Sequence, residues 1–272
     1  MSGAPPLPIV DGATRLFGII GDPIVQVGSP RLYTERFRAA GRNAILVPFH
    51  VLPDRFEESV RGLKALANLD GLVITVPYKA RIVPFVDRLM AMGEKVGAIN
   101  VMRRDRDGKW TGDMFDGRGL VKAVRKAGHR IEGRRVMLIG AGGVGSAIAV
   151  ALADAGAAGI TISDAEPARA AALSGRVAGL FPACRAIAGA PMAEGHDMIV
   201  NASPVGMAAG DGVPAPLGAL DPSTLVFDVI VKSEPTPFMR HARSFGCPTF
   251  GGYAMMETQV DEAIAFLDAG RT

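Results

Sequence analysis

The chain has 272 residues, of which 49% are hydrophobic and 21% are charged, and its formal net charge is only +3. This composition is that of an ordinary globular protein, long enough for one large domain or two of medium size. The small net charge argues against a nucleic-acid partner. The 2 cysteines and 4 histidines lack the spacing of metal ligands, so we expect no metal site and a cytoplasmic location. The first twelve residues lack the charged and apolar regions of a signal peptide.

The first third of the chain alternates predicted strands with predicted helices. Short apolar runs bounded by turn residues predict strands at 16–20, 44–49 and 71–75. Helices are expected between them, at 30–40 and 53–67. This order predicts parallel strands that are joined by crossover helices.

A hairpin and a further helix are expected next. Predicted strands at 99–102 and 109–111 flank the segment 105–108, whose aspartates and glycine are typical of a hairpin turn. A helix is expected at 117–127, directly before the middle of the chain.

The most informative segment begins at Val136. Four apolar residues, 136–139, predict a buried parallel strand, and a helix is expected at 144–155. The glycines between them have the G-x-G-x-x-G spacing, which provides a tight turn, close approach of the backbone to a pyrophosphate, and close packing of helix on strand. The start of the helix adds free N–H groups for the phosphates. We therefore expect the cofactor to be bound by Gly140, Ala141, Gly142, Gly143, Val144 and Gly145.

The same region has an alternative interpretation. Residues 136–153 carry no charge, and these 18 residues just reach the length of a membrane span. The glycine pattern and the charge of Asp154 directly afterwards favour strand, turn and helix instead. We expect no membrane partner.

The residue that ends the next strand bears on the choice of cofactor. Asp164 lies 24 residues beyond Gly140, where a carboxylate binds a ribose 2′-hydroxyl and repels a 2′-phosphate. Arg169, which is the nearest arginine, falls in the following helix. These residues predict NAD rather than NADP. The alternative is that Asp164 is only the N-cap of that helix.

The rest of the chain continues the α/β pattern. Strands are expected at 159–163, 198–201 and 225–230, and helices at 167–180, 237–245 and 255–267. The expected fold is an N-terminal α/β substrate domain, a Rossmann-type doubly wound parallel-sheet NAD(P) domain, and a C-terminal helix that returns to the first domain. The expected domains are 1–115 with 251–272 for substrate binding and catalysis, and 116–250 for the dinucleotide.

Seven ordered segments carry a resemblance to a known family: Gly21–Pro23 with Ser29–Pro30, Thr75–Lys79, Gly97–Asn100, Gly112–Gly117, Gly140–Ala147, Asn201–Met207 and Gly252–Gln259. Together they resemble the shikimate dehydrogenase family, from about Phe17 to Leu267. The resemblance implies a nicotinamide-dependent dehydrogenase of a cyclic polyol carboxylate, active in the cytoplasm in aromatic amino acid biosynthesis. It implies a small-molecule substrate and a monomer or homodimer.

The resemblance also assigns catalytic residues. Lys79 matches the family's catalytic lysine and Asp116 its catalytic aspartate. A lysine beside the carbinol oxygen exchanges the hydroxyl proton as the hydride moves, and a neighbouring carboxylate orients the lysine and binds a substrate hydroxyl. The alternatives are that Lys79 is an exposed residue at a helix start and Asp116 a helix N-cap.

Further site residues follow from the same matches. The substrate contacts implied are Ser29, Thr75, Asn100 and Gln259. Beside the glycine loop and Asp164, the cofactor contacts implied are Asn201, Ser203, Met207 and Gly252. Ser29 has an alternative role as a helix N-cap, and the two amides as partners of backbone groups.

The sequence departs from the family where the substrate is expected to lie. Polar residues of the family pattern are replaced at Val27, Val73, Met114, Phe115 and Val231. Three hypotheses therefore stand: a dehydrogenase of shikimate, quinate or an analogue, a dehydrogenase of a more apolar alcohol, and a non-catalytic NAD-binding regulator. Retention of Lys79 and Asp116 argues against the third.

Overall fold

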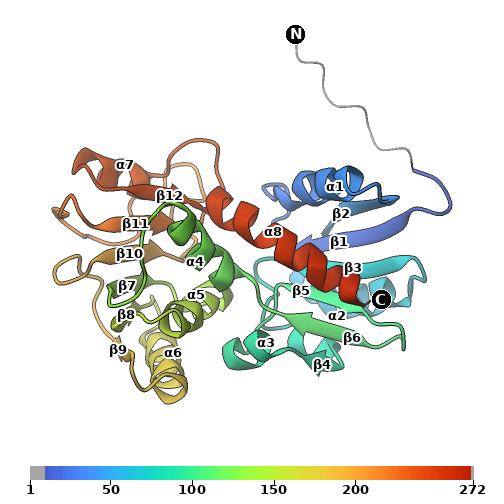
Figure 1. Cartoon of the computed structure of the whole chain (residues 1–272), viewed down its shortest axis with the longest axis horizontal. Helices are drawn as coiled ribbons and strands as arrows, with labels where there is room; N and C mark the ends of the chain where they lie inside the picture. The colour runs from blue at the N-terminus through green and yellow to red at the C-terminus, as the bar shows by residue number, and fades with distance from the viewer. Residues whose placement is uncertain (1–9, 271–272) are drawn as a thin grey trace, which may run out of the picture. The chain divides into compact units, whose positions relative to one another are not determined.

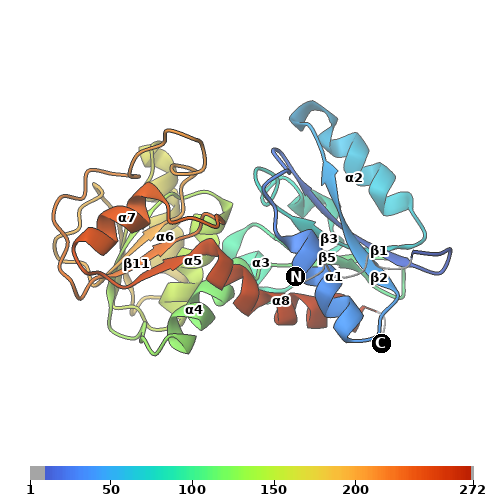
Figure 2. The ribbon, with the colours of Figure 1, turned by 90° about the horizontal axis from the view of Figure 1, so that it is seen from above.

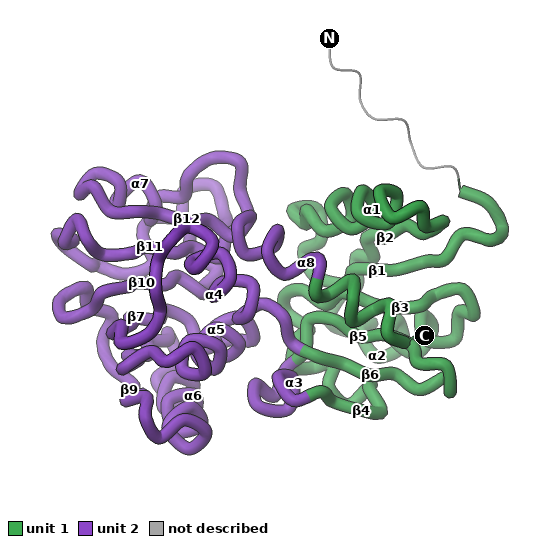
Figure 3. Tube along the Cα trace, viewed as in Figure 1, with its two compact units in different colours: residues 1–90, 99–113, 262–272 green, residues 91–98, 114–261 purple. Residues whose placement is uncertain are grey.

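The structure, a computed structural model, describes residues 10–270 and divides into two compact units (Figure 3). Unit 1 comprises residues 1–90, 99–113 and 262–272, and unit 2 comprises 91–98 and 114–261. The proline-rich leader, on which our expectation about a signal peptide rests, lies mostly outside the described residues. The units divide after 113 and after 261, whereas we expected divisions after 115 and after 250.

Unit 1 is built on one mixed sheet (Figure 1). Its elements are β1 (Arg15–Gly21), α1 (Ser29–Ala39), β2 (Ala44–His50), η1 (Pro53–Arg55), α2 (Phe56–Ala65), β3 (Leu69–Ile74), η2 (Val83–Phe85), β4 (Arg88–Leu89), β5 (Val101–Arg104) and β6 (Trp110–Asp113). The strand order is β2-β1-β3-β5-β6-β4. The first three strands pair in parallel and β5 and β6 form an antiparallel hairpin, so both expected patterns are confirmed.

The sheet of unit 1 is covered on both faces because its central strands are apolar on both sides. In β1, Phe17 packs on Phe37 of α1, with ring centroids 4.8 Å apart. Ile20, three residues further along β1, points to the other face and belongs to the core cluster that contains Phe56 and Val60 of α2. Helices α1 and α2 therefore cover opposite faces (Figure 2).

Unit 2 contains a fully parallel sheet. Its elements are α3 (Ala91–Val96), α4 (Asp116–Lys126), β7 (Arg135–Ile139), α5 (Gly143–Asp154), β8 (Gly159–Ser163), α6 (Pro167–Leu180), β9 (Arg185–Ala188), β10 (Met198–Asn201), β11 (Leu225–Asp228), α7 (Pro237–Ser244) and β12 (Thr249–Gly251). The strand order β9-β8-β7-β10-β11-β12 is the 3-2-1-4-5-6 order of a Rossmann-type sheet, counted from β7. The predicted fold class is confirmed.

The two faces of this sheet have separate cores. Helices α4, α5 and α6 share one core cluster with alternate residues of the strands, and α7 shares another with the residues between them. This arrangement explains why the strands of unit 2 are continuous apolar runs. The last helix, α8 (Gly252–Ala269), contributes 252–261 to unit 2 and its remainder to unit 1.

Candidate active site

The first candidate site is the carboxyl edge of the sheet in unit 2. Strands β7 and β10 lie next to each other in this sheet, and the strand order reverses between them. In open α/β sheets such a point forms a crevice between loops that leave in opposite directions, and ligands bind there. The glycine loop follows β7, and Asn201 ends β10.

The three glycines of the G-x-G-x-x-G pattern meet three different surroundings. Gly140 has φ of +104°, and a Cβ there would lie 2.7 Å from the carbonyl carbon of Ala202. A Cβ on Gly145 would lie 1.9 Å from the carbonyl oxygen of Gly140, so only glycine lets α5 approach the turn. A Cβ on Gly142 would meet nothing within 4 Å. The space beside Gly142 is therefore open toward solvent, as a cradle for a pyrophosphate requires.

The first turn of α5 supplies donors to the same space. Its N-cap is Gly142, which has no side chain to satisfy the first amides. The first helical bond runs from the N–H of Ser146 to the carbonyl oxygen of Gly142, at 2.8 Å. The N–H groups of Gly143, Val144 and Gly145 precede this bond, so the helix itself gives them no acceptor. These residues fit an anionic dinucleotide.

Asp164 is tied to the glycine loop. Its carboxylate accepts the N–H of Ala141 at 2.7 Å and the N–H of Glu166 at 2.9 Å. The N-cap of α6 is Glu166, so Asp164 is not the N-cap that the alternative proposed. Arg169 pairs with Glu166 at 2.8 Å. Both side chains of this pair are exposed, and Arg169 is the arginine nearest to Asp164 in the sequence.

The side chain of Asn201 makes hydrogen bonds to other groups of the protein. The residue is 0% exposed. Its carboxamide nitrogen donates to the carbonyl oxygen of Val205 and to the carboxylate of Asp228, both at 3.1 Å. Its carboxamide oxygen accepts the N–H of Ser203 at 3.0 Å and the hydroxyl of Ser203 at 2.7 Å. Asn201 and Ser203 therefore shape the loop after β10 through their own mutual bonds.

Asp228, at the end of β11, joins two loops. It is 0% exposed and accepts the N–H of Ile230 at 3.1 Å and the hydroxyl of Thr236 at 2.5 Å, besides the amide of Asn201. Burial raises the pKa of the Asp228 carboxyl, and the hydrogen bonds from Thr236, Ile230 and Asn201 act in the opposite direction. Asp228 and Thr236 were missed by the sequence reasoning; the only signal available was a lone acid that closes an apolar strand.

The remaining cofactor candidates lie in this neighbourhood. Met207 is half-buried in the loop after β10, whose Gly206 carbonyl accepts the ammonium of Lys232 at 2.7 Å. Gly252 begins α8, and a Cβ there would lie 2.1 Å from the carbonyl oxygen of Val229. Gly252 therefore allows α8 to start directly against the segment that leaves β11.

The second candidate site is the corresponding edge of the sheet in unit 1. Thr75 follows β3, and its N–H donates to the carbonyl oxygen of Ile20 at 3.0 Å. The carbonyl oxygen of Lys79 accepts the N–H of Ile99 at 2.9 Å. Asn100 bridges the N–H of Ile74 and the carbonyl oxygen of Asp113 through its backbone. These bonds bring Thr75, Lys79 and Asn100 to one edge of the sheet.

The other predicted residues lie on helices. Ser29 is the first residue of α1, whose N-cap is Gly28, and Asp116 is the first residue of α4, whose N-cap is Phe115. Neither residue is therefore the N-cap that the alternatives proposed. Asp116 is 3% exposed, in unit 2, and Gln259 lies half-buried on the part of α8 that belongs to unit 2.

The apolar departures from the family pattern have different surroundings. Val73, Met114 and Phe115 are buried, and the guanidinium of Arg118 lies 4.6 Å from the centre of the Phe115 ring. Val27 and Val231 are half-buried.

Among residues 10–270, no group of His, Cys, Asp and Glu side chains is arranged to hold a metal ion. Within the same residues, no helix combines the length and the apolar character that a membrane crossing needs.

Comparison with known proteins shows which family this chain is similar to. A family model described as the shikimate dehydrogenase substrate binding domain matches residues 19–102. The shikimate dehydrogenase (NADP(+)) of Rubrobacter xylanophilus is 37% identical over 94% of this chain and 92% of its own length. The resemblance stated from the motifs is therefore confirmed.

Solved structures agree. Shikimate 5-dehydrogenase of Listeria monocytogenes, in complex with shikimate and NAD, has a TM-score of 0.83 and 30% identity, covering 96% of this chain and 93% of that one. Quinate dehydrogenase of Corynebacterium glutamicum, in complex with NAD, has a TM-score of 0.80 and 27% identity, covering 93% of both chains.

Proposed function

Since this chain belongs to the shikimate dehydrogenase family, we propose that its substrate is shikimate, quinate or a close analogue of these cyclic polyol carboxylates. It is an oxidoreductase that acts on a CH–OH group with a nicotinamide cofactor. The observation that carries the proposal is the retained edge of unit 1, where Thr75, Lys79 and Asn100 converge.

We assign the cofactor to unit 2 and the substrate to unit 1. The bound nicotinamide cofactor supplies a hydride acceptor for the carbinol carbon. The open space at Gly142 and the first amides of α5 bind its pyrophosphate. The proposed substrate-binding and catalytic part, 1–115 with 251–272, and the proposed dinucleotide-binding part, 116–250, differ at their boundaries from the two compact units. Met207 and Gly252 line the nicotinamide end.

Lys79 is the proposed proton carrier. As the hydride leaves the carbinol carbon, the hydroxyl must lose its proton, and the lysine amine takes it; in ketone reduction the ammonium returns it. Asn100 binds a neighbouring hydroxyl, and Ser29 and Thr75 bind the carboxylate. Ser29 would act from the start of α1.

Asp116 completes the proposed catalytic pair. Asp116 is the third residue after Asp113, which ends β6 beside the backbone of Asn100. The covalent chain therefore holds the Cα of Asp116 within about 11 Å of that of Asp113 in any arrangement of the two units. This reach supports a role beside Lys79, orienting the lysine and binding a substrate hydroxyl. Gln259 supplies a further hydroxyl contact.

The Lys79→Met variant tests this assignment. We expect kcat for shikimate or quinate to fall by about 10²-fold to 10⁴-fold, because the hydroxyl proton loses its acceptor. The Kd of the cofactor should stay unchanged. The control is Lys109→Met, an exposed lysine between β5 and β6. Turnover by Lys79→Met within about threefold of the wild type refutes the lysine assignment. Turnover only of apolar alcohols refutes the substrate, and cofactor binding without any turnover indicates a regulator.

We further propose that NAD is preferred over NADP. The carboxylate of Asp164 stands at the end of β8, where the adenosine ribose would lie, and it opposes a 2′-phosphate by charge. Arg169 pairs with Glu166, which competes with that phosphate for the guanidinium. The relative from Rubrobacter xylanophilus is named for NADP(+), so this preference would distinguish the present chain from it.

The preference is measured as the ratio of kcat/KM with NAD to that with NADP. We expect the wild type to favour NAD by about tenfold or more, and Asp164→Asn to lower the ratio by about tenfold. Asparagine keeps one carbonyl oxygen for the N–H of Ala141 but removes the charge. The control is Asp154→Asn, at the end of α5. A wild type that favours NADP contradicts the proposal.

A further inference from the structure

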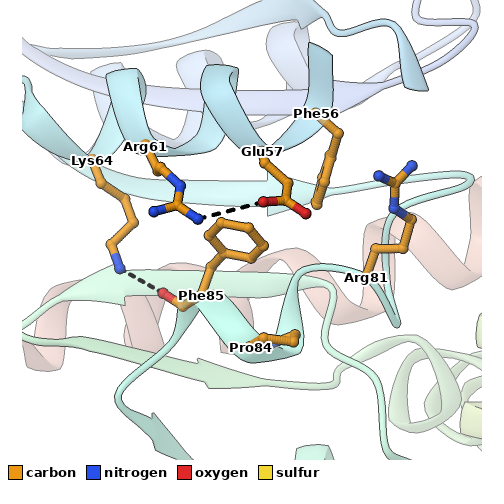
Figure 4. Close-up of a pocket in the computed structure, with 7 residues that line it drawn as sticks. All are labelled: Phe56, Glu57, Arg61, Lys64, Arg81, Pro84 and Phe85. Atoms are coloured by element: carbon orange, nitrogen blue, oxygen red, sulfur yellow. Dashed lines mark hydrogen bonds and ion pairs between the residues drawn. The ribbon is translucent and has the colours of Figure 1, made fainter. Parts of the chain in front are cut away.

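A groove in unit 1 lies outside the residues assigned above. It runs between α2 and the segment that contains η2, and its volume is about 680 Å³. The lining residues are Phe56, Glu57, Arg61, Lys64, Arg81, Pro84 and Phe85 (Figure 4). This volume lies within the range of small-molecule sites, roughly 300–1,000 Å³.

The groove has an apolar middle. Phe56 and Phe85 meet edge to face, with ring centroids 5.7 Å apart and an interplanar angle of 86°. Pro84 lies beside Phe85 (Figure 4). Behind them Phe56 stacks on Tyr78 with a centroid distance of 4.4 Å, so this wall is held in place by the core. A ring of a ligand would find aromatic and proline surface here.

Cations stand on both sides of this apolar middle. Arg61 and Lys64 lie on one side of the Phe85 ring, and Arg81 lies on the other (Figure 4). Glu57 is the single carboxylate of the lining, and it pairs with Arg61 at 3.4 Å. The lining residues therefore carry an excess of positive charge.

Two of the three cations, Arg81 and Lys64, are held in position by neutral partners. The guanidinium of Arg81 lies 4.6 Å from the centre of the Phe56 ring and donates to the carbonyl oxygen of Pro53 at 3.2 Å. Among residues 10–270 the structure gives Arg81 no ion pair. The Lys64 ammonium donates to the carbonyl oxygen of Phe85 at 2.6 Å. Burial lowers the pKa of Lys64, while the charges of Asp87 and Arg104 shift that pKa in opposite directions, so a ligand carboxylate beside this ammonium would offset the cost of burying its charge.

We propose that this groove binds a small dianion that carries an apolar ring between its two carboxylates. One carboxylate meets Arg81, the other meets Arg61 and Lys64, and the ring lies over Phe85. Both arginines retain N–H donors for a carboxylate, which they bind in a fork geometry. The proposal does not depend on the assigned substrate or cofactor, because none of the lining residues belongs to those sites.

The chain contains a built-in reporter for the groove. Trp110 is its single tryptophan, and the Lys64 ammonium lies 5.9 Å from the centre of the Trp110 ring. The experiment is therefore a titration of tryptophan fluorescence in the full-length protein with trans-cyclohexane-1,4-dicarboxylate. We expect saturable binding with a Kd of about 1 mM or lower. Succinate, which has no ring, should bind about fivefold more weakly or worse.

Variants assign the signal to the groove, because the probe also resembles the proposed substrate. Arg81→Gln and Arg61→Gln should each raise the Kd about fivefold, and Glu57→Gln should lower it, since a competing carboxylate is removed. Arg55→Gln, an exposed arginine paired with Glu58 outside the lining, should leave the Kd unchanged. The opposite effects of Glu57→Gln and Arg81→Gln cannot both arise from misfolding.

Two results overturn the proposal. The first is the absence of saturable binding up to about 10 mM, or a Kd that Arg81→Gln and Glu57→Gln leave unaltered. The second is tighter binding of a hexaglutamate peptide than of the dicarboxylate, which would assign the groove to an acidic protein segment.

Discussion

Gly142 and Gly145 are three residues apart, yet an added methyl group would meet opposite surroundings at the two positions. At Gly145 the methyl carbon would collide with the carbonyl oxygen of Gly140, whereas at Gly142 it would enter open space. The first glycine is thus required by the ligand that we propose, and the second by the fold. The G-x-G-x-x-G spacing predicts both needs but cannot show which contact enforces each one.

Gly142→Ala separates the two requirements. The residue has φ of −74° and ψ of −166°, an extended conformation that alanine adopts without strain. We expect the unfolding temperature to stay unchanged while the Kd of the nicotinamide cofactor rises about tenfold, because the methyl group occupies the pyrophosphate space. Gly145→Ala should both raise this Kd and lower the unfolding temperature. Unaltered cofactor affinity in Gly142→Ala would contradict the proposed position of the pyrophosphate, and calorimetric titration measures it.

At the scale of elements, long apolar runs identify strands and helices because a buried element needs several consecutive or regularly spaced apolar residues. The strands from β7 to β8 and the helix α5 were predicted within a residue or two. The short elements β9, β12 and α3 were missed because three to six residues carry too little periodicity.

The network around Asp228 could not be predicted for a different reason. Its partners Asn201 and Thr236 lie 27 and 8 residues away in the chain, and only the pairing of β10 with β11 and the turn into α7 bring them together. The sequence indicates a polar residue at position 201, but it does not show that groups of the protein itself satisfy the hydrogen bonds of the Asn201 carboxamide. For this reason Asn201 and Ser203 contribute to the loop after β10 by shaping it.

Asp228 makes a prediction about pH. Because its pKa is raised by burial from an ordinary value of 3.8, its contribution to stability is fully present below that value and is lost as the pH rises through the raised pKa. Asp228→Asn does not titrate. The free energy of unfolding of the wild type, relative to the variant, should therefore fall as the pH increases through this window, and urea unfolding at a series of pH values measures it.

The control for this experiment has the opposite sign. Hydrogen bonds from Ser223 lower the pKa of Asp221, which lies at the surface of the same unit. The wild type, compared with Asp221→Asn, should gain stability as the pH rises. A difference for Asp228→Asn that is independent of pH would show that the buried carboxyl keeps the same pKa in the folded and unfolded chain.

At the scale of the whole molecule, the chain leaves unit 1 briefly for 91–98, leaves it again after β6, and returns to it in the second half of α8. That return depends on local contacts in unit 1. A Cβ on Gly71 of β3 would lie 2.4 Å from a methyl carbon of Leu267, and Arg42 pairs with Asp268 at 2.8 Å. The motifs predicted a returning helix, but not that the boundary lies within it.

Leu267→Ala tests the contribution of this return. Leu267 is 1% exposed, so the substitution should cost about 2–5 kcal/mol of the free energy of unfolding. Cofactor affinity should remain unchanged, because the glycine loop belongs to unit 2. Leu180→Ala, at an exposed position that ends α6, is the control. A loss of cofactor affinity equal to the loss of stability would show that the two units do not bind and unfold separately.

The most direct test of the proposed activity is the kcat/KM of the purified chain for shikimate and for quinate, each with NAD and with NADP, followed by the absorbance of the reduced nicotinamide. We predict turnover of at least one of the two compounds, greater efficiency with NAD, and loss of that turnover in Lys79→Met. Absence of turnover of both compounds with either cofactor, or wild-type turnover by Lys79→Met, would contradict the assignment of substrate or of proton carrier.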